Sequence, residues 1–395
     1  MGLFGFNFVS QTAAQSRPKS MARKIVVFKS GVLNESAREE LINRFGGVKV
    51  KDLTLIDGKA VILPEDSQAA LVQQAGVLRV EDDVEVFALE NPANNFRSFR
   101  RSAFIQPAQV LPWGIDRIDA EKVWATSTAD TIKVAIIDTG IDKDHADLIA
   151  NLRGGVNFVS KSPVKPADPN KWDDDNGHGT HVAGIVATVD NEIGVIGTAP
   201  EAYLWAVKVL DSNGSGYVSD VIDGINWAIT NHMQVTNMSL GTTANILSFQ
   251  EAIQRANAAG ITQVAAAGNS GGAVNYPAAY PEVIAVSATD IADNIPYWSS
   301  RGSEVDLSAP GVSIFSTYKG GKYKTLSGTS MAAPHVAGAA ALVIDKKTCD
   351  YDFNGICSPA EVQQRLEATA EDLGITGKDN LYGSGLVDAE KALMP

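Results

Sequence analysis

The chain has little of several features that would point to common classes of protein. It contains only 2 cysteines, which allow at most one disulfide bond within the chain. It has no apolar run long enough to cross a bilayer, so we expect no membrane partner. Basic residues are outnumbered, with 33 Lys and Arg against 46 Asp and Glu, and the net charge of −13 argues against nucleic acid as a partner.

The charge that is present lies unevenly along the 395 residues. Residues 1–108 carry 14 basic and 12 acidic groups, whereas the remainder carries 19 basic and 34 acidic groups. An acidic larger part suits solubility and bound cations. With 45% hydrophobic residues and 35 glycines, the chain can bury one large α/β core and form a separate small domain.

Three short stretches supply an acid, a base and a nucleophile in a fixed order. They are VAIIDTGID around Asp138, NGHGTHVAG around His178 and SGTSMAAPHVAG around Ser330. A serine hydroxyl becomes a good nucleophile when an imidazole takes its proton and a buried carboxylate holds that imidazole in one tautomer. The three stretches together therefore predict acyl transfer.

The local sequence predicts that each of these side chains stands at the boundary of a secondary-structure element. Residues 134–137 are typical of a buried parallel strand, and Asp138 follows at its carboxyl end, where functional residues of such sheets collect. Glycines flank His178 ahead of a helical run. Ser330 lies between Gly328 and an Ala-rich helix predicted for residues 331–345.

Each residue taken alone also has a purely structural interpretation. Asp138 could cap a turn and Ser330 could cap a helix. His178 and His181 could form a metal pair on one helical face, although no further His, Cys or Glu occurs at a recognisable ligand spacing in that segment. The conjunction of three glycine-flanked matches in one order favours the catalytic interpretation.

These motifs resemble those of the subtilisin-like serine proteases, over roughly the whole chain after residue 108. The resemblance implies a three-layer, doubly wound α/β fold with a mainly parallel sheet, and a serine endopeptidase that works through an acyl-enzyme intermediate. Asp138 would orient the imidazole, His178 would act as general base and then general acid, and Ser330 would attack. His181 would be structural.

The stretch AAAGNSGG resembles the oxyanion segment of the same family. The resemblance implies that the side-chain amide of Asn269 donates to the developing oxyanion, together with the backbone N–H of Ser330. Without the other three motifs, Asn269 would be interpreted as a turn residue before Gly271.

Residues 25–89 are predicted to form a small domain of their own. Strand, helix, strand, strand, helix and strand follow in the order of ferredoxin-like α+β modules, with the second helix in EDSQAALVQQAG and the last strand in VLRVEDDVEVFAL. The segment resembles the subtilisin propeptide, which implies that it assists folding and inhibits the catalytic domain. A small regulatory or binding domain is the alternative.

The predicted boundaries are an N-terminal extension over residues 1–24, the propeptide domain over 25–89, a linker over 90–108 and the catalytic domain over 109–395. By resemblance, the segment EDDVEVFAL would lie in the active-site cleft, which predicts self-cleavage between Leu89 and Glu90. The arginine cluster at residues 97–101 could be cut by another protease or be a solvated charge run. The mature enzyme is expected to be a monomer.

The resemblance also places an extended protein or peptide substrate between SNGSGYVS and NMSLG. Glycines there let a peptide backbone pair as an added strand, so broad specificity is expected. Alternatively, these glycines could simply belong to loops and have no role in binding. Ala266, Ala267 and Gly268 would wall a primary pocket that prefers apolar or aromatic side chains, with Asn275 near its floor. Thr242, at the pocket rim, replaces a glycine usual in the family. The predicted substrate-binding residues are Gly214, Ser215, Gly216, Ser239, Leu240, Gly241, Ala266, Ala267, Gly268 and Asn275.

Calcium (Ca2+) is the cofactor that the sequence predicts. The family's strongest site matches ligand by ligand, with the side chains of Gln109, Asp147 and Asn191 and the carbonyls of Val189, Ile193 and Val195. The segment DYDFNGICSPAE fits the EF-hand loop pattern in full, through the side chains of Asp350, Asp352, Asn354 and Glu361 and the carbonyl of Ile356. A chance acidic loop is the alternative to this second site. The acidic residues 173–175 are a weaker candidate, and solvated surface charge explains them equally well.

The only cysteines, Cys349 and Cys357, bracket the second calcium loop. They could form a disulfide that locks this loop, or remain reduced thiols. A disulfide would favour an extracellular setting. The N-terminus shows no continuous apolar signal core, yet a propeptide, calcium sites and a cysteine pair predict secretion. The alternatives in other function classes are a catalytically silent binding protein and a calcium-sensing module.

Overall fold

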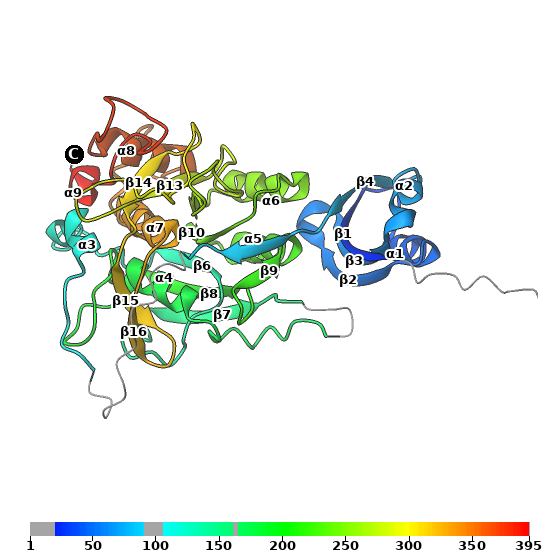
Figure 1. The fold of residues 1–395 in the computed structure, drawn as a ribbon, viewed down its shortest axis with the longest axis horizontal. Coiled ribbons are helices and arrows are strands. Elements are labelled where there is room, and N and C mark those ends of the chain that lie inside the picture. Colours follow the sequence, from blue (N-terminus) through cyan, green and yellow to red (C-terminus); the bar gives the residue numbers. More distant parts are fainter. Residues whose placement is uncertain (1–19, 91–105, 161–164, 395) are drawn as a thin grey trace, which may run out of the picture.

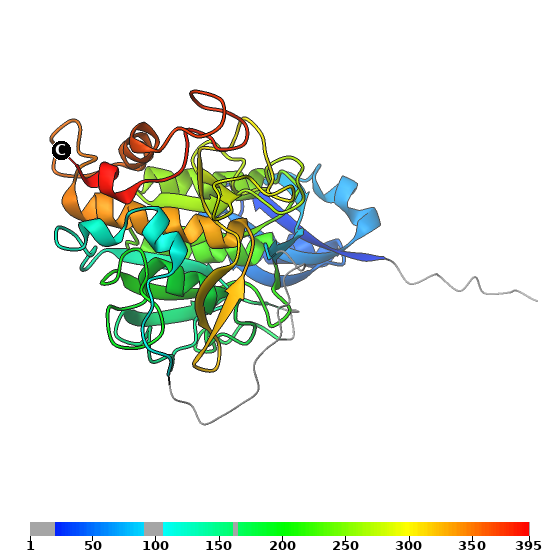
Figure 2. The same cartoon turned by 60° about the vertical axis from the view of Figure 1, so that its left-hand side comes forward.

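The computed structural model describes residues 20–90, 106–160 and 165–394. A small N-terminal unit lies against one side of a much larger unit, and one strand of the chain runs from the first into the second (Figure 1). The long helix α7 (Thr329–Lys346), drawn in orange, belongs to the larger unit (Figures 1 and 2).

The small unit is a four-stranded antiparallel sheet with two helices on one face. Its strands are β1 (Met21–Phe28), β2 (Val48–Leu53), β3 (Gly58–Pro64) and β4 (Val77–Asp82), in the order β2-β3-β1-β4. Its helices are α1 (Glu35–Arg44) and α2 (Gln68–Leu71). This is the ferredoxin-like order that the sequence predicts.

Three details of this unit differ from the sequence prediction. The first strand, β1, begins at Met21, within the segment predicted to be an N-terminal extension over residues 1–24. The second helix is short, because a 3₁₀ turn (Glu65–Ser67) comes before the four residues of α2. The last strand is divided, because β4 ends at Asp82 and β5 (Glu85–Ala88) leaves the small sheet. β5 instead forms the middle of a three-stranded sheet in the order β11-β5-β9.

The large unit is built on a seven-stranded, entirely parallel sheet in the order β14-β13-β12-β10-β6-β8-β7. This agrees with the predicted doubly wound α/β fold. The strands are β6 (Lys133–Asp138), β7 (Leu152–Asn157), β8 (Tyr203–Lys208), β10 (Val235–Met238), β12 (Thr262–Ala266), β13 (Ile284–Thr289) and β14 (Leu307–Pro310).

Helices cover both faces of this sheet, because alternate residues of each strand point to opposite sides. Val134 and Ile136 of β6 belong to the core that includes α4 (His178–Ala187) and α7. Ala135 and Ile137 of the same strand belong to the core that includes α5 (Val218–Thr230) and α6 (Leu247–Ala258). The result is the three-layer arrangement expected from the sequence.

Shorter elements complete the large unit around this sheet. Strands β9 (Ser215–Tyr217) and β11 (Leu240–Gly241) flank β5, and β15 (Ile314–Tyr318) pairs with β16 (Lys322–Leu326) as a hairpin. The remaining helices are α3 (Trp113–Arg117), α8 (Pro359–Thr369) and α9 (Ala389–Leu393). Across the parts of the chain that the structure describes, none of the helices combines the length and apolarity that a bilayer crossing requires.

The two units share a hydrophobic core. The small sheet turns Ile25 and Val27 toward α5 and α6, in the same buried cluster as Phe249. Its opposite face carries Val26 and Phe28, which pack under the helices of the small unit. The small sheet is therefore covered on both faces only while it is docked on the large unit, so its docking contributes apolar burial to the folding of both.

Candidate active site

Asp138 and His178 meet at the carboxyl end of the central strand β6. Asp138 is the last residue of that strand and His178 is the first residue of α4. The His178 Nδ1 atom lies 2.8 Å from Asp138 Oδ1, which also accepts the Thr139 N–H at 2.7 Å. Both side chains are fully buried. This contact fixes the imidazole in the tautomer that leaves Nε2 free to accept a proton.

The electrostatics of the pair favour a protonated imidazole. Burial by itself lowers the pKa of His178, but the charge of Asp138 and its hydrogen bond outweigh that effect and raise the pKa to about 9. The Glu90 carboxylate also raises this pKa. An imidazole in this environment stabilises the positive charge that it gains when it takes a proton.

Close approach at this corner explains the residue that follows the histidine. A side chain at Gly179 would place its Cβ 2.2 Å from the Gly140 carbonyl oxygen and 3.1 Å from Asp138 Oδ1. Glycine is thus the residue that lets α4 begin beside the strand end. His181, one turn further on, is fully buried, and its Nε2 lies 3.1 Å from the Ile314 carbonyl and 3.0 Å from the Lys324 carbonyl. It ties α4 to the β15–β16 hairpin, as the structural role predicted for it requires.

Ser330 is the second residue of α7, and its hydroxyl donates a hydrogen bond to the Leu89 carbonyl. Its hydroxyl lies 2.7 Å from the Leu89 carbonyl oxygen and 3.0 Å from the Ser239 carbonyl oxygen. The Asn269 side-chain amide donates to the same Leu89 oxygen. The Ser330 hydroxyl and the Asn269 amide thus meet at the carbonyl of the Leu89–Glu90 bond. The charge of Glu90, which follows this bond, raises the pKa of His178.

The uncharged Leu89 carbonyl oxygen accepts hydrogen bonds from the Asn269 amide and the Ser330 hydroxyl. The Ser330 hydroxyl points at the carbonyl, and His178 Nε2 is buried without a hydrogen-bond partner among the described residues.

Comparison with known proteins identifies the family to which this chain belongs. The family model described as "Subtilase family" matches residues 129–385. Subtilisin E of Bacillus subtilis (strain 168) is 40% identical over 393 residues, which cover 97% of this chain and 94% of the relative. The alkaline protease of Shouchella clausii is 42% identical over 360 residues (91% and 83%), and Subtilisin Savinase of Lederbergia lenta is 47% identical over 287 residues (72% and 99%).

The chain belongs to the subtilase family. It is a subtilisin-like serine endopeptidase, as the three motifs in the sequence suggest.

In this subtilase, Thr329 sets the orientation of the Asn269 amide, a role that the sequence analysis missed. The Thr329 N–H and hydroxyl both lie 2.9 Å from Asn269 Oδ1 and donate to it. With its oxygen held in this way, the amide must present its N–H group to the Leu89 carbonyl. The only signal in the sequence was a hydrogen-bonding residue immediately before Ser330.

The structure also explains the acidic residues 173–175 that come before His178. Asp174 is buried and accepts hydrogen bonds from the Thr139 hydroxyl at 3.0 Å, the Gly177 N–H at 2.8 Å and the Thr180 N–H at 3.0 Å. It therefore braces the loop between Asp138 and His178. Asp173 and Asp175 form ion pairs with Lys143 and Lys208.

The predicted substrate-binding segments of the subtilase lie on both sides of the strand that ends at Leu89. β5 is antiparallel to β9 on one side and to β11 on the other, with Val86 opposite Gly216 and Ala88 opposite Leu240. The Ala88 N–H donates to the Gly214 carbonyl at 2.9 Å, and the Leu89 N–H donates to the Ser239 carbonyl at 3.2 Å. Main-chain hydrogen bonds of this kind recognise an extended peptide without regard to its side chains.

The residues predicted to form the primary pocket lie close to one another, and Gly241 lies beside the Leu89 side chain. β12 ends at Ala266, and Ala267 and Gly268 follow it; all three residues are buried. The Asn275 N–H donates to the Ala267 carbonyl at 2.8 Å. A Cβ at Gly241 would stand 3.2 Å from Leu89 Cδ1. At the rim, Thr242 and Tyr276 exchange two backbone hydrogen bonds of 2.9 Å, so the residue that departs from the family pattern is part of a regular bridge.

The residues of the first predicted calcium site gather in one place. Asn191 Nδ2 lies 2.9 Å from Asp147 Oδ1, the Val195 N–H lies 3.0 Å from Asp147 Oδ2, and the Asn191 N–H donates to Gln109 Oε1 at 2.7 Å. Asp147 is fully buried, and burial raises its pKa. Both Asp147 carboxylate oxygens accept hydrogen bonds from N–H groups, whereas a bound calcium ion would need oxygen ligands around it.

The second predicted calcium loop is closed by the disulfide between Cys349 and Cys357, whose Cα atoms lie 5.4 Å apart. Carboxylate oxygens of Asp350, Asp352 and Glu361 come within 4.8 Å of one another. Asn354 Oδ1 accepts the Ile356 N–H at 2.8 Å, and the Glu361 carboxylate also accepts from Ser358 at the start of α8. Glu361 is thus both a helix cap and a possible cation ligand.

Proposed function

We propose that this subtilase is synthesised as a zymogen that cleaves its own chain between Leu89 and Glu90, and that it then acts as an extracellular, calcium-stabilised endopeptidase. One observation carries the proposal. The Leu89 carbonyl oxygen lies 2.7 Å from the Ser330 hydroxyl and accepts a hydrogen bond from Asn269, so this peptide bond occupies the position of a substrate.

The proposed reaction begins when the Ser330 hydroxyl oxygen attacks the Leu89 carbonyl carbon and passes its proton to His178 Nε2. Asn269 Nδ2 and the Ser330 N–H donate to the resulting oxyanion. His178 then gives its proton to the Glu90 nitrogen, the Leu89–Glu90 bond breaks, and Leu89 remains as an ester on Ser330. Attack by water on this ester releases the Leu89 carboxylate and restores the hydroxyl.

Asp138 is proposed to orient His178 and to stabilise its protonated form without taking the proton itself. The 2.8 Å contact to Nδ1 and the raised pKa of His178 support this role. The buried Asp174 and Thr139 would act through the loop geometry, as positioning residues rather than catalytic ones.

The small unit, residues 20–89, is proposed to be a propeptide that assists folding and inhibits the enzyme. β5 fills the substrate cleft, and two carboxylates next to it cap helices of the large unit. Asp83 accepts the Ser219 N–H at 2.9 Å at the start of α5, and Glu81 accepts the Leu247 N–H at 2.9 Å at the start of α6. The arginine cluster at residues 97–101, where another protease could trim the linker further, lies outside the described part.

Proteins and peptides are proposed as substrates, bound as an added strand between β9 and β11. Leu89 in the primary pocket supports a preference for apolar or aromatic side chains at the position before the cleaved bond. The mature enzyme is proposed to be a monomer. The disulfide around the second loop favours an extracellular setting.

The proposed function can be tested by incubating the full chain with a serine-directed phosphonate or sulfonyl fluoride and mapping the product by mass spectrometry. We expect one adduct on Ser330 and a new N-terminus at Glu90. An intact chain that hydrolyses no generic peptide and carries no adduct would favour the alternatives of a silent binding protein or a calcium-sensing module.

Calcium is proposed to stabilise the fold rather than to take part in bond cleavage. Gln109, Asp147 and Asn191 would hold one ion, with the carbonyls of Val189, Ile193 and Val195. Asp350, Asp352, Asn354 and Glu361, with the Ile356 carbonyl, would hold another. In each case the cation would neutralise carboxylates that the fold brings together.

Removal of calcium is expected to lower thermal stability far more than initial turnover. A cation held at about 100 times its dissociation constant contributes about 2.7 kcal/mol, which corresponds to roughly 5–10 °C in the unfolding midpoint of a domain of this size. The midpoint would be measured with and without a chelator on the Ser330→Ala chain, which cannot digest itself, and turnover would be measured on the wild type.

Two variants separate the proposed calcium sites. Asp147→Asn should lose most of its response to the chelator if the first site dominates, whereas Asp350→Asn should retain it. Equal and immediate loss of stability and turnover in the wild type would contradict a purely stabilising role.

A further inference from the structure

Lys51 of the small unit reaches a recess on the large unit that is built to receive a cation. Its ammonium group donates to the Phe158 carbonyl at 2.9 Å and to Asp220 Oδ1 at 2.5 Å, and it lies 3.0 Å from Asp223 Oδ2. The Asp220 side chain is only 1% exposed. Two carboxylates and one carbonyl oxygen, all from the large unit, thus surround a single positive charge.

Arg23 of the small unit fills the adjoining part of the same recess. Its guanidinium donates to the Ser160 carbonyl at 3.0 Å, lies 3.9 Å from Asp220 Oδ1 and stacks 3.9 Å above the centre of the Tyr217 ring. A carbonyl oxygen, a carboxylate and an aromatic face are together a favourable environment for arginine. We call the Phe158 and Ser160 carbonyls with Tyr217, Asp220 and Asp223 the cation recess.

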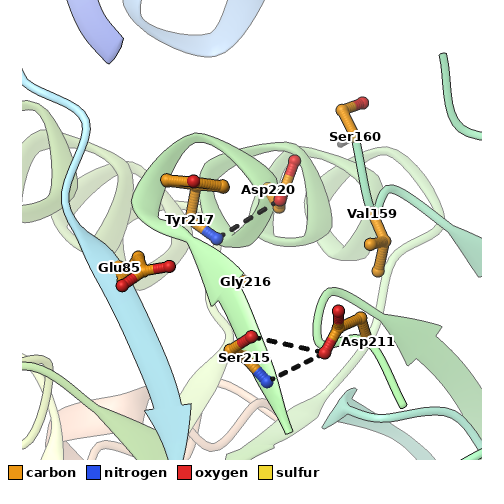
Figure 3. Close-up of a pocket in the computed structure, with 8 residues that line it drawn as sticks. All are labelled: Glu85, Val159, Ser160, Asp211, Ser215, Gly216, Tyr217 and Asp220. Carbon is orange, nitrogen blue, oxygen red and sulfur yellow. Dashed lines mark hydrogen bonds between the residues drawn. The ribbon is translucent and has the colours of Figure 1, made fainter. Parts of the chain in front are cut away.

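The cation recess lies beside the strand that pairs with the substrate. Glu85, the fifth residue before the Leu89–Glu90 bond counting Leu89 as the first, lies directly opposite Tyr217, whose N–H donates to Asp220 Oδ2 at 3.2 Å. A cavity of about 160 Å³ opens next to this pair. Figure 3 shows Glu85 on one side of β9 and Asp211, Val159 and Ser160 on the other.

We propose that the cation recess is a further substrate-binding site, which selects a lysine or arginine at the fifth position before the cleaved bond. The inference rests on the proposed peptidase function and adds to it a specificity beyond the primary pocket. Lys51 and Arg23 would occupy in the zymogen the place that a substrate side chain takes after the propeptide has left.

The charges support this assignment. Among the described residues, the ion-pair partners of Asp220 and Asp223 are Lys51 and Arg23, both of which leave with the propeptide. Burial raises the pKa of Asp220 to about 6 against the opposing effect of these cations. In the part of the chain that the structure describes, the mature enzyme would therefore present two carboxylates and two carbonyl oxygens at this site with no cation of its own.

The strand that ends at the cleaved bond brings no positive charge of its own to the cation recess. Glu85 is exposed and carries the same charge as Asp211 and Asp220, which line the cavity with it. In the zymogen the positive charge arrives instead from β1 and β2. A substrate with Lys or Arg in place of Glu85 would bring that charge on the bound strand itself.

The test uses three peptide substrates that are identical except at the fifth position before the cleaved bond, which is Lys, Gln or Glu. The full chain is allowed to process, and its active fraction is counted by covalent labelling of Ser330. We expect kcat/KM to fall in the order Lys, Gln, Glu, with about a three- to tenfold difference between the first and the last, as for one partly buried ion pair. Mass spectrometry verifies that all three are cut at the same bond.

Asp220→Asn and Asp223→Asn should each move the Lys-to-Glu ratio toward one, and Asn at 220 can still accept the Tyr217 N–H. If one of these variants fails to fold, the other one still tests the role of the cation recess. Glu304→Gln, which removes an exposed negative charge ahead of β14 at the opposite edge of the sheet, should keep the wild-type ratio.

The outcomes distinguish this inference from the function on which it rests. Equal hydrolysis of all three peptides by the wild type would overturn the cation site and leave the peptidase proposal intact. A ratio that survives both recess variants would also overturn it, because it would reflect the general negative charge of the protein. A chain that hydrolyses none of the peptides and carries no label on Ser330 would overturn both.

Discussion

The Ser330→Ala chain is expected to remain one uncut polypeptide of 41.8 kDa under conditions in which the wild type loses its first 89 residues. The Leu89 carbonyl is already in contact with the Ser330 hydroxyl and the Asn269 amide, so the substitution removes the attacking atom and leaves the bound strand in place. Loss of the nucleophile lowers turnover by about a millionfold in a subtilisin, a relative of this chain.

Time courses followed by mass spectrometry would measure this loss directly. Ser327→Ala is the matched control, because it removes a buried hydroxyl three residues away, which accepts the Ser313 N–H at 2.8 Å. That variant should still process. Appearance of a Glu90 N-terminus in purified Ser330→Ala at the wild-type rate would show that another group, or a contaminating protease, cuts the chain.

The stable uncut chain would also report on the docking of the propeptide. The small sheet shares a buried cluster with α5 and α6, and Arg79 forms an ion pair of 2.7 Å with Glu251. These contacts explain why the cleaved strand would remain in the cleft and inhibit the enzyme until it is degraded or displaced. Cleavage and activation are therefore separate steps in the proposed sequence of events.

The sequence predicted the large fold because that fold depends on local patterns. The apolar run at 134–137 and the glycines beside His178 are properties of single segments, and each segment forms the element expected of it. The strand order of the small unit follows in the same way from its alternation of strands and helices.

What the sequence could not predict depends on contacts between distant segments. The run at 77–89 is uniformly strand-like, but whether it stays in one sheet depends on competition between β1 and the edges β9 and β11. The roles of Thr329 and Asp174 are equally invisible, because each depends on which residue lies opposite in the folded chain. Lys51 resembles any surface lysine until its partners Asp220 and Asp223 are known.

The second prediction concerns the oxyanion. Replacing Asn269 by Ala should slow both self-cleavage and peptide hydrolysis by about 100- to 1,000-fold, a magnitude known from such a donor in a subtilisin, a relative of this chain. The Asn269 amide already donates to the Leu89 carbonyl, but its hydrogen bond strengthens only when that oxygen becomes negatively charged. The loss should therefore appear in kcat, with KM little changed.

Thr329→Val tests the same Asn269 amide with a smaller expected effect. It removes one of the two donors that hold Asn269 Oδ1, and the Thr329 N–H at 2.9 Å remains. We expect a smaller fall in kcat, of about tenfold or less, in keeping with the loss of one positioning hydrogen bond. If Asn269→Ala instead raised KM and left kcat unchanged, the amide would bind the ground state only. The Leu89 contact would then mark a binding site for the strand rather than an arrangement poised for reaction.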